Sequence, residues 1–134
     1  MNKISTPFNI HGVGRRKSAV ARVWLKLGTG KVEVNGKKHS DYFDTKLHAT
    51  TAIFPFKVCG MEKSFDVKVA VVGGGLSGQA DAIKLGIARA LVSSNASLRP
   101  VLRQHDLLTV DSRLKERKKY GRKAARRRFQ FVKR

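Results

Sequence analysis

The last 18 residues of the chain, 117–134, carry ten basic side chains and no acidic one. Like charges at this density repel one another and few apolar residues separate them, so this segment cannot contribute to a folded core. Residues 1–32 are also purely basic, with seven positive side chains, whereas residues 33–116 hold twelve basic and nine acidic ones. The chain of 134 residues therefore has room for one nearly neutral domain between two basic ends.

The overall charge points to a polyanionic partner. The formal net charge is +20 and the sequence pI is near 11.1, which favours nucleic acid as the partner. The single cysteine, Cys59, excludes a disulfide within the chain and is expected to be a half-buried apolar residue. The first ten residues lack the apolar core of a signal peptide, and no apolar run has membrane-spanning length. We therefore expect a soluble protein that has no membrane partner.

An alternating apolar pattern after Ser18 predicts a β-strand with one buried face. The Gly28-Thr29-Gly30 segment predicts a hairpin, with residues 31–34 running back from it. Asn35-Gly36 predicts a two-residue turn, because both residue types accept a positive φ. The apolar face of the first strand consists of Ala19, Ala21, Val23, Leu25 and Leu27.

The middle of the chain contains a weak pattern followed by a clear strand. Residues 39–51 fit one or two short helical turns, and Pro55 is expected to end whatever structure precedes it. Residues 65–71 alternate apolar and polar side chains and predict a strand that ends at the three glycines 73–75.

Two helices are expected after these glycines. The first is predicted to start with Ser77 as its N-cap and to continue through Val92. A shorter one is predicted from Ser97, with Pro100 tolerated in its first turn, and residues 107–110 fit an edge strand. The side chains expected to face inward are Ala80, Ile83, Ile87, Ala90 and Leu91 in the first helix and Leu98, Val101 and Leu102 in the second.

These elements predict an α/β (α+β) two-layer sandwich, because a sheet with one apolar face needs a helical layer on that face. A small mixed sheet would be covered on one side by two helices, and a basic tail would leave it. The expected organisation is a flexible lead-in at residues 1–13, a globular domain at 14–112 and an extended basic tail at 113–134.

The glycines 73, 75 and 78 satisfy the G-x-G-x-x-G pattern of dinucleotide-binding proteins, between a predicted strand and a predicted helix. Two strands and a turn precede the motif, however, and the acid expected about twenty residues later is replaced by Ser97-Leu98-Arg99-Pro100. We therefore favour a tight turn that holds an RNA phosphate over a dinucleotide site. The four histidines are scattered and predict no metal site, and no residue pattern predicts an enzyme or a bound cofactor.

Two segments interleave basic residues with small or aromatic ones. The first is 14–22, G-R-R-K-S-A-V-A-R, and the second runs from Arg113 to Arg134. Arginine donates paired hydrogen bonds to phosphate, and lysine adds a mobile charge. Tyr120, Phe129 and Phe131 are equally compatible with stacking on bases and with packing against protein.

At these motifs the chain closely resembles the family of the ninth protein of the small ribosomal subunit, in its bacterial and organellar form. The resemblance runs from about residue 12 to the end of the chain, in order and with the family's spacing. Besides 14–22, the matching motifs are V-V-G-G-G-L-S-G-Q-A-D-A-I at 71–83, G-I-A-R-A-L at 86–91, L-L-T-V-D-S-R at 107–113, E-R-K-K-Y-G at 116–121 and R-R-R-F-Q-F-V-K-R at 126–134.

The resemblance implies a structural, non-enzymatic protein in the head of the small subunit, bound to the 3′ major domain of its ribosomal RNA and beside other head proteins. It also implies a left-handed β-α-β crossover and a tail whose last two residues, Lys133 and Arg134, reach the anticodon stem-loop of the peptidyl-site tRNA. The ribosome would be cytoplasmic or organellar. Composition without the resemblance leaves a nucleic-acid chaperone or DNA-compacting protein as the alternative. The residues expected to bind ribosomal RNA are Arg15, Arg16, Lys17, Arg22, Gly74, Gly75, Gln79, Arg113, Arg117, Lys118, Lys119, Arg122, Lys123, Arg126, Arg127 and Arg128.

Overall fold

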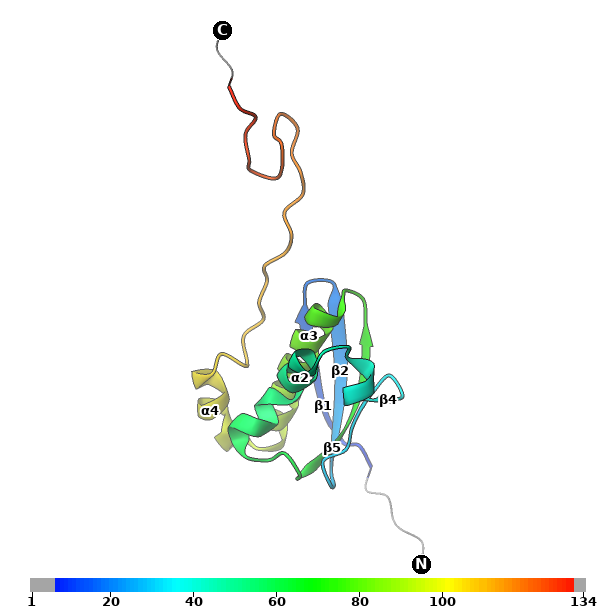
Figure 1. The fold of residues 1–134 in the computed structure, drawn as a ribbon. Helices are drawn as coiled ribbons and strands as arrows, with labels where there is room; N and C mark the ends of the chain where they lie inside the picture. The colour runs from blue at the N-terminus through cyan, green and yellow to red at the C-terminus, as the bar shows by residue number, and fades with distance from the viewer. Residues whose placement is uncertain (1–6, 132–134) are drawn as a thin grey trace, which may run out of the picture.

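The computed structural model describes residues 7–131, which form a sheet, a helical layer and an extended tail (Figure 1). The sheet has five strands in the order β1-β2-β5-β3-β4. Its strands are β1 (Ile10–Arg16), β2 (Ala19–Leu27), β3 (Val32–Val34), β4 (Lys37–Lys38) and β5 (Phe65–Val72). The helices are α1 (His39–Tyr42), α2 (Lys46–Cys59), α3 (Leu76–Ser94), the 3-10 turn η1 (Ala96–Leu98) and α4 (Arg99–Gln104).

Helices cover one face of the sheet and leave the other open, which confirms the predicted two-layer α/β architecture (Figure 1). The long helix α3 lies across β1 and β2, and α2 packs beside α3. Phe56 of α2 reaches the sheet, where its ring lies 6.2 Å from that of Phe65 in β5. The second covering helix is therefore α2 and not the segment after Ser97, which forms only the short α4 packed on α2.

The two strands predicted most clearly form the centre of the sheet. β2 and β5 pair in antiparallel register, with Val23 opposite Val69, and their inward side chains are buried as expected. Leu27 is the exception: it ends β2 and is 69% exposed. The inward residues of α3 are all buried against this surface.

The first strand begins at Ile10, so residues 10–13 belong to the sheet and the expected flexible lead-in is wrong for them. The sequence shows no alternating apolar pattern for this strand, because glycines, Gly12 and Gly14, occupy its buried face. A Cβ on Gly14 would lie 1.8 Å from the carbonyl oxygen of Ala82 in α3. The helix thus rests directly on the backbone of β1, which only glycine permits.

The predicted hairpin at Gly28-Thr29-Gly30 is wrong, because β5 lies between β2 and β3. The loop crosses the start of β5, where one carboxylate oxygen of Asp66 accepts hydrogen bonds from the amides of Thr29, Gly30 and Lys31 at 2.9, 3.1 and 3.0 Å. β3 and β5 are parallel and are joined through α1 and α2, which makes this connection the β-α-β unit of the fold. Its left-handed crossover stays a prediction from the family resemblance.

The Asn35-Gly36 turn is confirmed as the connection between β3 and β4. Asn35 and Gly36 have φ values of 50° and 82°, and Val34 pairs with Lys37 across them. The Asn35 side chain also extends the pairing with β5: it donates to the carbonyl of Val71 at 2.9 Å and accepts from the amide of Val71 at 3.0 Å.

The remaining helical predictions are corrected in part. Pro55 does not end a helix but lies within α2, where its ring is fully buried and tertiary packing outweighs the lost hydrogen bond. The helix α3 starts at Leu76, with Gly75 as its N-cap instead of Ser77. Pro100 does lie in the first turn of α4, but Val101 is 39% exposed.

The predicted edge strand at 107–110 is not formed. Leu107 is buried, and its amide donates to the carbonyl of Leu102 at 3.0 Å, which closes the end of α4. The segment is thereby held against the helical layer, and it pairs with none of the five strands of the sheet. Cys59 is half-buried as expected, and burial raises the pKa of its thiol.

Candidate nucleic-acid interface

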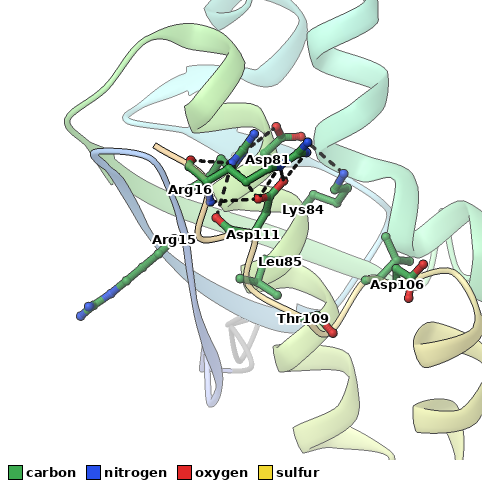
Figure 2. Close-up of a pocket in the computed structure, with 10 residues that line it drawn as sticks. Arg15, Arg16, Asp81, Lys84, Leu85, Asp106, Thr109 and Asp111 are labelled. Carbon is green, nitrogen blue, oxygen red and sulfur yellow. Dashed lines mark hydrogen bonds and ion pairs between the residues drawn. The ribbon is translucent and has the colours of Figure 1, made fainter. Parts of the chain in front are cut away.

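The first basic segment lies at one end of the sheet, where β1 turns into β2. Arg15 and Lys17 are exposed there, and Lys17 occupies the turn with a φ of 52°. Figure 2 shows the Arg15 side chain pointing away from the neighbouring ion pairs that Arg16 forms with Asp81 and Asp111. Both side chains are therefore free to meet a phosphate group. Arg22 is exposed on the open face of the sheet, where its guanidinium carbon lies 5.7 Å from the centre of the Trp24 ring.

Arg16 has a different environment, because its guanidinium is engaged within the protein (Figure 2). It lies 3.1 Å from the carboxylate of Asp111 and 3.6 Å from that of Asp81, and its side chain is 14% exposed. It also donates to the backbone carbonyls of Asp111 and Arg113, at 3.4 and 3.1 Å. Arg16 thus fastens the start of the tail to β1 and α3, a role that sequence reasoning missed. Its contact with RNA stays a prediction.

Asp111 completes the attachment of the tail. Arg113 donates to both of its carboxylate oxygens, at 3.0 Å from Nε and 2.7 Å from Nη2. These hydrogen bonds, aided by the charge of Arg16, hold the pKa of Asp111 well below its usual range. Lys84, which like Asp81 belongs to α3, lies 3.4 Å from the Asp81 carboxylate and extends the cluster along the helix. The cluster leaves one edge of Arg113, which is 83% exposed, facing solvent.

The glycine loop lies beside this basic turn. A Cβ on Gly73 would come within 2.4 Å of the Ser18 carbonyl oxygen, and one on Gly74 within 3.1 Å of Ala19. Gly73 and Gly74 also have positive φ values of 76° and 65°, whereas Gly75 has a φ of −100° and open space around it. The structure therefore brings two of the predicted RNA-binding segments, 15–17 and 73–75, to the same end of the sheet.

Gln79 connects the glycine loop to α1 through two hydrogen bonds. Its amide nitrogen donates to the carbonyl of Gly73 at 3.0 Å, and its amide oxygen accepts from the Tyr42 hydroxyl at 2.6 Å. Tyr42 comes from α1, far away in sequence, so no local pattern could have indicated this contact. An RNA contact by Gln79 stays a prediction beside this connecting role.

The glycine motif lacks the surroundings of a dinucleotide site. That site requires a further parallel strand after the helix, with an acidic residue at its end. Among residues 7–131, β5 is the last strand, and α3 is followed only by η1, α4 and the tail. Residues 7–131 also contain no group of three or more metal-binding side chains, and no helix there is long and apolar enough to cross a membrane.

The tail leaves the body after the Arg16–Asp111 attachment as an extended chain (Figure 1). Most of its described side chains are exposed, including the predicted RNA-binding residues Arg117, Lys118, Lys123, Arg126, Arg127 and Arg128, whereas Lys119 and Arg122 are half-buried within the tail itself. Phe129 and Phe131 are 62% and 87% exposed and do not pack into the body. Lys133 and Arg134 lie outside the described residues.

Sequence comparison with known proteins identifies the family of the chain. A family model described as "Ribosomal protein S9/S16" matches residues 14–134. A small ribosomal subunit protein uS9 of Thermotoga maritima is 53% identical over 127 residues, which are 92% of this chain and 95% of the relative. The uS9 protein of Chlorobium chlorochromatii is 52% identical over 125 residues, or 93% and 97% of the two chains. The resemblance found in the sequence motifs is thereby confirmed: the chain belongs to the ribosomal protein S9/S16 family.

Proposed function

We propose that this protein is a structural, RNA-binding constituent of the small subunit of the cytoplasmic ribosome. Its relatives of 52–53% identity over most of the chain are small ribosomal subunit proteins, and the family is one of ribosomal proteins, not of enzymes. The observation that carries the proposal is the tail: residues 117–134 hold ten basic and no acidic side chains, and the described part of this segment runs away from the folded body (Figure 1). Such a tail gains counter-charge and order by lying along RNA phosphates.

The finer assignment concerns where the protein lies on the RNA. We infer that its body sits on the 3′ major domain of small-subunit ribosomal RNA, in the head, beside other head proteins. The surface suited to this contact combines the exposed Arg15 and Lys17 with Gly75, which leaves the backbone open to approach by phosphate. The glycine loop and the adjacent helix N-terminus both favour an anion at this end of the sheet.

The tail would pass inward from that surface. An extended chain covers at most about 3.3–3.6 Å per residue, so the ten residues 125–134 would span at most roughly 35 Å if fully extended. That length allows Lys133 and Arg134 to reach the anticodon stem-loop of a peptidyl-site tRNA, where they would contact the backbone as charges.

A salt-wash and footprinting experiment tests the assignment. Small subunits reconstituted without this protein are compared with subunits carrying it, by sedimentation after a moderate salt wash and by chemical probing of the RNA. We expect the protein to stay with the subunits and to protect nucleotides of the head domain. Association with DNA in place of subunits would instead support the DNA-compacting alternative, and protection confined to another RNA domain would contradict the head assignment.

A further inference from the structure

Within the tail, one acidic residue closes a loop. Glu116 is the only acid after Asp111, and its carboxylate binds Lys119 through one oxygen and Arg126 through the other, the latter at 2.9 Å. The Arg126 contact joins residues ten positions apart, and Figure 1 shows the tail doubling back on itself in this region. The remaining tail is nearly extended, so this loop is a local structure in its own right.

Backbone contacts support the same loop. The amide of Lys123 donates to the carbonyl of Arg127 at 2.8 Å, and the Arg122 guanidinium donates to the carbonyl of Arg126 at 2.8 Å. Gly121 turns the chain with a φ of 68°, a conformation that most other residues adopt at a cost. Lys119 and Arg122 are half-buried by these contacts. The loop is thus closed by hydrogen bonds between its two arms and turns at Gly121.

The turn presents an aromatic ring to solvent. Tyr120 precedes Gly121 and is 94% exposed, the highest exposure among the large hydrophobic residues of the described chain. Its ring takes part in no aromatic or cation–π pair among residues 7–131. An aromatic ring left uncovered at a turn has its stacking surface available for a partner.

The charges around the ring select the kind of partner. Residues 117–127 contain seven basic side chains and no acidic one, so the partner is a polyanion. A flat aromatic ring stacks on a nucleobase, and a base offers its face only where it is not stacked in a duplex. We propose that the loop closed by Glu116 is a binding site for one unpaired RNA nucleotide, whose base stacks on Tyr120 while its phosphates meet the surrounding lysines and arginines. This inference rests on the proposed RNA-binding function and adds a defined site to it.

Glu116 has an unusual role in such a site, because an acidic residue would there favour RNA binding. In a purely electrostatic tail this carboxylate opposes RNA binding, so its neutralisation would strengthen binding. If Glu116 instead holds the loop in its binding conformation, neutralisation of its carboxylate opens the loop. RNA binding must then also order the loop, and this entropic cost weakens the affinity. The two accounts predict opposite signs for the same substitution.

The test measures the affinity of the full chain for a transcript of the head domain of small-subunit RNA. We expect Tyr120→Ala to weaken binding by roughly tenfold, the effect of losing one aromatic stack, and Tyr120→Phe to stay within about twofold of the unmodified protein. Glu116→Gln should weaken binding by about twofold to fivefold, as expected for an exposed ion-pair network. Glu62→Gln removes the same charge from an exposed site on the body and serves as the matched control.

Ultraviolet cross-linking supplies a second readout, since Tyr120 should join to an unpaired nucleotide of the transcript. Thermal unfolding of each variant should be unchanged, because all the substituted residues of the loop are exposed. Binding by Glu116→Gln as tight as by Glu62→Gln, or by Tyr120→Ala as tight as by the unmodified protein, overturns the loop site while leaving RNA binding intact. A cross-link from Tyr120 to a protein neighbour in subunits also overturns it. Failure of the unmodified chain to bind the transcript overturns the proposed function itself.

Discussion

The guanidinium of Arg16 lies 3.1 Å from the carboxylate of Asp111, although 95 positions separate the two residues in the chain. This contact joins the end of β1 to the segment just before the tail and sets where the tail leaves the body. The surface with Arg15 and the glycine loop is thereby placed next to the tail, so that one RNA molecule can meet both.

Loss of the contact between Arg16 and Asp111 should destabilise the domain and leave the exposed charges of the neighbouring residues in place. We expect Arg16→Ala to lower the free energy of unfolding by about 1–2 kcal/mol, since Arg16 donates several charged hydrogen bonds and is largely covered. Arg15→Ala, at the exposed neighbouring position, should change it by less than about 0.5 kcal/mol. Urea denaturation of the three proteins makes the measurement. Equal unfolding midpoints for the two variants would contradict the assigned role of Arg16.

Substitutions at two positions of the glycine loop should distinguish an effect on folding from an effect on RNA contact. Gly73→Ala should cost about 1–3 kcal/mol of stability, because its φ of 76° and the Ser18 carbonyl 2.4 Å from a Cβ both oppose a side chain. Gly75→Val should cost less than about 1 kcal/mol, since its φ is negative and its surroundings are open. If RNA phosphate approaches this loop, Gly75→Val should nevertheless reduce incorporation into small subunits.

Thermal unfolding and subunit incorporation, measured for both glycine variants, check this separation. Normal incorporation of a folded Gly75→Val protein would remove the loop from the RNA-binding surface. Added NAD should leave the melting temperature unchanged, and a clear stabilisation would instead revive the dinucleotide interpretation.

The regular periodic elements of this fold were predictable and the long-range contacts were not. β2, β5 and α3 follow from apolar patterns within each segment, and the Asn35-Gly36 turn follows from residues that accept positive φ. β1 is not predictable as a strand from the apolar pattern, because Gly12 and Gly14 fill its buried face without an apolar side chain. Pro55 was misjudged because burial of its ring in the helical layer outweighs a local preference.

The candidate site shows the same division. Basic residues that are exposed along the turn and the tail could be predicted from composition, because a dense positive charge needs a polyanion wherever it lies. The roles of Arg16 and Gln79 could not, because each depends on a partner from another element, Asp111 and Tyr42 respectively. The insertion of β5 between β2 and β3 was missed for the same reason, since strand order is not a property of neighbouring residues.

Asp66 should make stability depend on pH in the acid range. Burial of its carboxyl opposes ionisation, but the amides of Lys31, Thr29 and Gly30 outweigh it and hold the pKa of Asp66 below its ordinary value. A lowered pKa in the folded state stabilises the fold above the unfolded pKa of about 3.9, and this contribution is lost as pH falls through the folded pKa. Asp66→Asn should therefore lower the melting temperature clearly at pH 6 and much less at pH 3.

The substitution Asp44→Asn, at an exposed site in the loop before α2, is the matched control for Asp66→Asn. It should have little effect at either pH. A deficit of Asp66→Asn that is as large at pH 3 as at pH 6 would show that the loop is held by packing and not by the ionised carboxylate.

Deletion of Lys133 and Arg134 should separate tRNA binding from assembly. Subunits carrying the shortened protein should assemble normally but bind peptidyl-site tRNA more weakly, and the difference should shrink as salt rises, because the lost contacts are charges on phosphate. Filter binding of tRNA at two salt concentrations measures the effect. Identical tRNA affinities at low salt would contradict a role of this tip.

The central claim is that the tail binds ribosomal RNA through its charges, and the salt dependence of binding tests it most directly. The affinity of the full chain for the head-domain transcript is measured against salt concentration and compared with that of a variant in which Arg126, Arg127 and Arg128 are changed to Gln. Each lost phosphate contact lowers the slope of log affinity against log salt by about 0.7–0.9, so we predict a slope shallower by roughly two to three. An unchanged slope would contradict the account.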